Sequence, residues 1–176
     1  MMSAYPLGYR IAQAVGLSGA AWLSGNIAAL SLIAVPALAQ SRDEKSLSPS
    51  AAVKLWKKMY DAGKSQNPPI AATTAAAFLY LAWSVRRGAP LIHSTTYSLA
   101  GLYATAATLT VSIVPYTIVA MRPTNNALIK LAGSRDLTAA EETQSNDLLG
   151  RWIVLNGIRS ILPLVGGLVG ITAAFL

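Results

Sequence analysis

Three residues in the last apolar stretch of the chain carry side chains that could line a ligand pocket. They are Trp152, Asn156 and Arg159, and their i, i+4, i+7 spacing puts them on one stripe of a helix. A guanidinium supplies a cation, an amide supplies hydrogen-bonding groups, and an indole supplies an aromatic surface. The stripe therefore predicts one side of a ligand pocket. The alternative for Arg159 is that its side chain extends to the membrane interface.

Further aromatic, amide and hydroxyl side chains are predicted at the same membrane level as this stripe. Each has an ordinary structural explanation as well: asparagine in such a helix often joins helices, and Trp and Tyr often anchor a protein at the membrane interface. Together they predict a pocket with aromatic walls, amide hydrogen-bonding groups and one arginine. The proposed lining residues are Trp22, Asn26, Trp56, Tyr60, Tyr116, Thr117 and Asn125.

Metal and nucleotide chemistry find no support in the residue types. The chain has one histidine, His93, no cysteine and seven scattered carboxylates, so no metal site is predicted. His93 falls in a loop on the opposite side of the predicted membrane from the pocket. Phosphate-binding loops, dinucleotide fingerprints and serine-nucleophile elbows are absent from the sequence.

The elements that position these residues follow from the distribution of charge. Of the 176 residues, 53% are hydrophobic and only 12% are charged, about half the usual share for a soluble domain. Long charge-free runs predict transmembrane helices, because a helix needs about 20 apolar residues to cross a bilayer. We expect four, at about 11–39, 69–86, 96–121 and 152–175, in an all-α integral membrane four-helix bundle that forms a single domain over residues 1–176.

An additional amphipathic helix is predicted at about 50–63, between the first two spans. Val53, Trp56 and Tyr60 fall on one of its faces and several lysines on the other, as in helices that lie along a membrane surface. Gly63 is expected to end it.

Basic residues indicate how the chain is oriented. The net charge is +7, and ten Lys and Arg residues fall in the two larger loops against three on the other side. This bias predicts cytoplasmic loops and non-cytoplasmic termini; we expect no nucleic-acid partner. The motif VPALAQ resembles a signal-peptidase site, but the apolar stretch before it is too long for a signal peptide, so we expect the first helix to be retained.

Four motifs, in this order and spacing, resemble the DUF1772 family of small membrane proteins, which includes the fungal anthrone oxygenases. The motifs are SGNIAALSLIAVPAL, LWKKMYDAG, VPYTIVAMRPTNNAL and RWIVLNGIRSILPLVGG. The resemblance implies oxidation of an anthrone-type aromatic polyketide to an anthraquinone by dioxygen, without a cofactor. It implies Arg159 and Asn156 as stabilisers of an oxyanion and Tyr60 as an acid–base partner. Asp61 and His93 remain candidates for the base.

The resemblance also sets the expected partners and location. They are a lipophilic aromatic substrate, dioxygen and the lipid bilayer, with a multi-pass location in the endoplasmic reticulum or another endomembrane if the source is eukaryotic. A homo-oligomer is left open. Two alternative functions remain: another membrane enzyme, such as a cyclase or isomerase of a lipophilic metabolite, or a non-catalytic membrane protein.

Overall fold

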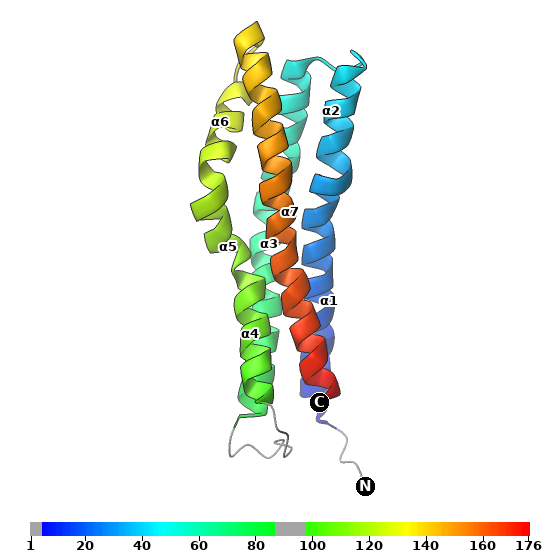
Figure 1. Ribbon diagram of the computed structural model, residues 1–176. Coiled ribbons are helices and arrows are strands. Elements are labelled where there is room, and N and C mark those ends of the chain that lie inside the picture. Colours follow the sequence, from blue (N-terminus) through cyan, green and yellow to red (C-terminus); the bar gives the residue numbers. More distant parts are fainter. Residues whose placement is uncertain (1–4, 87–97) are drawn as a thin grey trace. The chain divides into compact units, whose positions relative to one another are not determined.

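The described part of the chain, residues 5–86 and 98–176 of a computed structural model, is built from helices without a strand (Figure 1). This confirms the all-α prediction. The elements in chain order are α1 (Leu7–Ala29), a π-helical turn η1 (Leu30–Ala34), α2 (Val35–Asp43), α3 (Pro49–Ser84), α4 (Leu99–Val111), α5 (Ile113–Tyr116), a second π-helical turn η2 (Thr117–Met121), α6 (Arg122–Ala132) and α7 (Ala139–Phe175).

Three helical stretches among the described residues are long and apolar enough to cross a membrane. They are Leu7–Asp43, Leu99–Ala132 and Ala139–Phe175. The first and third contain the predicted spans at 11–39 and 152–175, and the second covers the predicted span at 96–121 from residue 99 onward. The fourth predicted span, 69–86, falls largely in the second half of α3, which is not among the three.

Helix α3 corrects one prediction. Gly63 does not end a separate amphipathic helix, because α3 runs without interruption from Pro49 to Ser84 and includes Pro68 and Pro69. A glycine in a helix costs about 1 kcal/mol, and each proline removes a backbone hydrogen bond. Burial on both sides of this weak segment offsets those costs, since Trp56 before it and Phe78 after it are fully buried. Packing of an apolar face, rather than local propensity, determines where this helix ends.

The chain divides into two compact units, and the first comprises Met1–Ser24, Asn67–Ile113 and Ile161–Leu176. Its core contains Tyr9, Phe78 and Tyr103 from α1, α3 and α4. Glycines admit the Phe78 ring: a Cβ added at Gly16 or Gly170 would lie 2.8 or 2.6 Å from Phe78 Cε1. Small residues therefore let the helices of this unit approach closely, as is common in membrane proteins.

The second unit comprises Gly25–Gln66 and Val114–Ser160. Its buried core gathers apolar and aromatic side chains from α2, α3, η2, α6 and α7, namely Val35, Val53, Trp56, Met121, Leu128, Leu131, Ala132, Leu149 and Trp152. The predicted site residues, with the exception of Trp22, belong to this unit. A single domain over residues 1–176 stays a prediction.

Hydrogen-bonded caps fix two helix ends of the second unit. Thr138 and Glu141 form a capping box at the start of α7: the Thr138 N–H donates to Glu141 Oε2 (2.8 Å) and the Glu141 N–H to Thr138 Oγ1 (3.3 Å). Helix α2 ends in a Schellman motif, in which Lys45 has a φ of 59° and its N–H donates to the Arg42 carbonyl.

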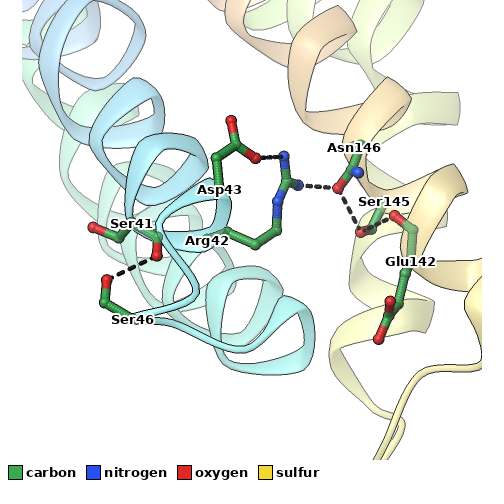
Figure 2. Close-up of polar contacts among 7 residues, drawn as sticks. All are labelled: Ser41, Arg42, Asp43, Ser46, Glu142, Ser145 and Asn146. Atoms are coloured by element: carbon green, nitrogen blue, oxygen red, sulfur yellow. Dashed lines mark hydrogen bonds and ion pairs between the residues drawn. The ribbon is translucent and has the colours of Figure 1, made fainter.

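A polar network links the end of α2 to the first turns of α7 (Figure 2). Arg42 donates one hydrogen bond to Asn146 Oδ1 and contacts Asp43 Oδ1 at 3.2 Å. Ser145 donates to the Glu142 carbonyl at 2.7 Å. The Arg42 side chain is only 15% exposed, so this network holds the polar end of the second unit together.

Candidate active site

Arg159 and Asn156 form the centre of a hydrogen-bonded chain that joins α7 to α1 and η1 within the second unit. The Arg159 Nη2 group donates to Asn156 Oδ1 at 2.7 Å. The Asn156 amide in turn donates to the Ile27 carbonyl at 2.9 Å and to Ser31 Oγ at 2.7 Å. Because Nδ2 is engaged twice, the amide can turn only its oxygen toward the guanidinium. Asn156 is fully buried, so this chain fixes the position of Arg159.

The guanidinium of Arg159 has neutral partners. Its Nη1 group donates to Thr117 Oγ1 at 3.0 Å, and it lies within electrostatic range of the Tyr60 and Tyr116 phenols. The two ion pairs found among the described residues involve other arginine and lysine side chains. A half-buried cation without a carboxylate partner attracts an anionic ligand.

Three aromatic side chains of the same unit, Trp56, Tyr60 and Trp152, pack together and form an aromatic layer. Trp152 lies one turn before Asn156 and donates its Nε1–H to Asn125 Oδ1 at 3.0 Å. Trp56 meets the Trp152 ring edge to face, with centroids 5.8 Å apart, and stacks on Tyr60 at 5.2 Å. Such surfaces suit a flat aromatic ligand. Trp56 is not an exposed interfacial anchor, because it is fully buried.

The structure does not gather every predicted site residue. Trp22 belongs to the first unit and is 43% exposed, while Asn26 is half-buried on α1 in the second unit. Asp61 is exposed and pairs with Lys57 at 2.5 Å, so it does not join the Arg159 network. His93 lies outside the described residues.

The two π-helical turns bring two hydroxyl side chains to the site, and one of them, Ser31, is not among the residues predicted from the sequence. Ser31 comes from η1 and Thr117 from η2, and both bond to the Asn156–Arg159 pair. Each turn ends two residues before a proline, Pro36 or Pro123, whose ring disfavours the ordinary i to i−4 register. Single π-helical turns are frequent at functional sites. A proline in the spans, preceded by an isolated hydroxyl residue, is the signal that could have identified Ser31.

Metal-ligating side chains do not cluster in the described part of the chain, where no group of three or more His, Cys, Asp or Glu residues is close enough to hold an ion. The polar groups around Asn156 are one guanidinium, that of Arg159, with amides, hydroxyls and phenols.

Comparison with known proteins identifies the family. Residues 56–169 match the family model described as "Anthrone oxygenase". The anthrone oxygenase encC of Aspergillus fumigatus is 38% identical over 172 residues, which cover 91% of this chain and 90% of that protein. An anthrone oxygenase of Claviceps purpurea is 33% identical over 90% of this chain and 85% of its own length. A noranthrone monooxygenase of Aspergillus flavus is 30% identical, covering 85% of this chain and 66% of its own. No solved structure matches. The segment matched by the family model includes Trp56, Tyr60, Asn125, Trp152, Asn156 and Arg159, and the chain belongs to the anthrone oxygenase family.

Proposed function

We propose that this protein is a monooxygenase that converts an anthrone to an anthraquinone with dioxygen. The observation that carries the proposal is Arg159: a half-buried cation, held by neutral hydrogen-bond partners in an aromatic interior, in a chain of the anthrone oxygenase family. An anthrone is a flat, apolar tricycle that becomes an oxyanion when its methylene loses a proton. That combination of shape and charge matches what the second unit offers.

The reaction balances without a further reactant. Loss of a methylene proton gives an anion whose negative charge is delocalised onto the carbonyl oxygen. The electron-rich anion transfers one electron to dioxygen, and recombination of the two radicals forms a carbon–oxygen bond to a peroxide, which takes up a proton. Loss of water from the hydroperoxide leaves the second carbonyl, so one anthrone and one dioxygen give one anthraquinone and one water. We propose that the protein needs no cofactor for these steps, because the substrate anion itself reduces dioxygen.

The protein's contribution is to favour and hold the anion. Arg159 is assigned to the developing oxyanion, and Asn156 holds the guanidinium and contributes its own dipole. Tyr60, within electrostatic range of Arg159, is assigned as the acid–base partner. Two tryptophans, Trp56 and Trp152, are assigned to the ring system of the substrate.

The other predicted binding residues of the second unit are assigned to orienting these side chains or to the path of the substrate. Thr117 and Asn125 orient the guanidinium and the Trp152 indole through their hydrogen bonds. Tyr116 and Asn26 are proposed to line the path of the substrate, whereas Trp22 belongs to the first unit and is not assigned to this path. For the base, Asp61 is the less attractive candidate because of its exposed pairing with Lys57, and His93 remains.

We further propose that the second half of α3 is a fourth membrane-spanning segment. The lysines of its first half are then at the membrane surface. The site opens toward the cytoplasm. Location in the endoplasmic reticulum or another endomembrane belongs to the same proposal. Cysteine placed at position 45 tests the orientation, because a membrane-impermeant reagent should label it from the cytoplasmic side only. Labelling from the lumenal side alone would invert the topology.

The function itself is tested with purified protein and emodin anthrone under air and under nitrogen, with a metal chelator present. Faster quinone formation under air than with heat-denatured protein supports the proposal, and persistence of that rate with the chelator supports chemistry without a metal. If the protein does not exceed the denatured control, the two alternatives, another membrane enzyme or a non-catalytic membrane protein, take precedence.

A further inference from the structure

Two buried hydrogen-bond donors of the second unit have no partner among the described residues and are not used by the proposed mechanism. They are the indole N–H of Trp56 and the hydroxyl of Thr124. The two side chains are 0% and 2% exposed. A buried donor without an acceptor is unfavourable by about 1–3 kcal/mol, and in folded proteins such groups are rare. Two of them in one small core call for an explanation.

Thr124 differs from other helical threonines of this chain. Thr73, Thr108, Thr110, Thr143 and Thr172 each donate their hydroxyl to the carbonyl four residues earlier, at 2.8–3.1 Å. For Thr124 that carbonyl belongs to Ala120, inside the π-helical turn η2. The wider turn changes the register of the backbone carbonyls. The hydroxyl of Thr124 therefore loses the local acceptor that helical threonines ordinarily use.

Both donors belong to the part of the second unit that holds the aromatic side chains. Thr124 lies on the face of α6 that also carries Leu128, with Met121 one turn before it, and these two residues share a buried cluster with Trp56. Trp56 itself contacts Trp152 and Tyr60. By contrast, the indole N–H of Trp152 already has its acceptor, Asn125. The Nε–H of Arg159 is also buried without a partner, but it belongs to the guanidinium already assigned to the oxyanion. The unpaired donors of this unit that have no assigned role are therefore those of Trp56 and Thr124.

We propose that the Trp56 Nε1–H and the Thr124 hydroxyl form a subsite for an oxygen substituent of a flat aromatic ligand, a ring hydroxyl or carbonyl distinct from the oxyanion bound by Arg159. This inference rests on the proposed function, because it takes the ligand to be an anthrone. Two recognition points fix the tricycle in one orientation: the guanidinium at the reacting ring and the donor pair at an outer ring. Trp56 and Thr124 then determine which hydroxylated anthrones are accepted.

The test compares two ligands and four proteins. Full-length protein in lipid nanodiscs is equilibrated under nitrogen with 1,8-dihydroxyanthrone or with unsubstituted anthrone, and empty nanodiscs correct for partitioning into lipid. Trp56→Phe keeps an aromatic ring without the N–H, and Thr124→Val keeps the shape without the hydroxyl. Trp152→Phe is the matched control, because its indole N–H is already bonded within the protein. Thermal midpoints of all four proteins establish that each is folded.

The expected result is a loss of preference in the two test variants. The preference is the dissociation constant of unsubstituted anthrone divided by that of 1,8-dihydroxyanthrone. It should fall by about tenfold in Trp56→Phe, which corresponds to the free energy of one hydrogen bond. It should also fall in Thr124→Val. In Trp152→Phe, both dissociation constants should change by a common factor. If each test variant changes both dissociation constants by the same factor, the subsite is overturned. It is also overturned if the wild-type protein binds neither ligand.

Turnover under air separates this inference from the proposed function. Oxidation of both anthrones by the wild-type protein, without a change in preference in the variants, would overturn the subsite alone. A clear change in binding preference, without oxidation by the wild-type protein, would support the subsite and overturn the proposed function.

Discussion

Replacing Arg159 with lysine tests whether the guanidinium acts through its geometry or only through its charge. In the structure two nitrogens of the planar group are engaged at once, Nη1 with Thr117 Oγ1 at 3.0 Å and Nη2 with Asn156 Oδ1 at 2.7 Å. Lysine keeps the positive charge but replaces the rigid fork with a single flexible ammonium. We therefore expect Arg159→Lys to fold and to lose the aimed contact with the oxyanion.

The expected size follows from the loss of one well-aimed donor, which typically costs about 3–4 kcal/mol of barrier, or roughly 10²–10³ in kcat. Quinone formation is followed by absorbance, with the spontaneous rate subtracted. Arg151→Lys is the matched control, since Arg151 is an exposed residue two turns earlier on α7; it should retain its rate. Near-normal turnover by Arg159→Lys, with an unchanged thermal midpoint, would remove Arg159 from the site.

Two further predictions concern stability, measured as thermal midpoints in detergent. Gly170→Ala should destabilise the protein by about 1–3 kcal/mol, because the Phe78 ring lies between Gly16 and Gly170 and cannot move away from a new methyl group. Gly150→Ala is the control, because a Cβ at Gly150 meets no atom within 4 Å. This control variant should be more stable than the wild-type protein by up to about 1 kcal/mol. A drop of equal size in both variants would refute the packing argument. Lys45→Gly should raise the midpoint, by about 1 kcal/mol in stability, because Lys45 has a φ of 59°; a lowered midpoint would show that the lysine side chain matters more than its backbone conformation.

The parts of the fold that the sequence predicts well are those that depend on near neighbours. Thr138 and Glu141 stand three residues apart, the spacing of a capping box, and they form one at the start of α7. The prediction that a helix ends at Gly63 is wrong because it depended on near neighbours alone. Glycine and two prolines weaken a helix locally, but α3 is stabilised by core residues on both sides of them, and that burial depends on segments distant in the sequence.

The same distinction applies to the candidate site. The stripe of Trp152, Asn156 and Arg159 follows from helical periodicity, and the structure joins Asn156 to Arg159 directly. Helical periodicity does not predict the bonding of Ser31 and Thr124, because that bonding depends on the π-helical turns, which shift the backbone register by one residue. Amphipathic periodicity assumes a uniform α-helix, so it carries no information about such turns.

The central claim, that this protein oxidises an anthrone with dioxygen, is tested most directly by isotope incorporation. Purified protein is given an anthrone under ¹⁸O₂, and the quinone is analysed by mass spectrometry against a heat-denatured control. The expected product is quinone carrying one ¹⁸O atom, formed faster than in the control and with the other ¹⁸O atom in water. A rate no greater than that of the control, or quinone whose new oxygen comes from unlabelled water, would contradict it.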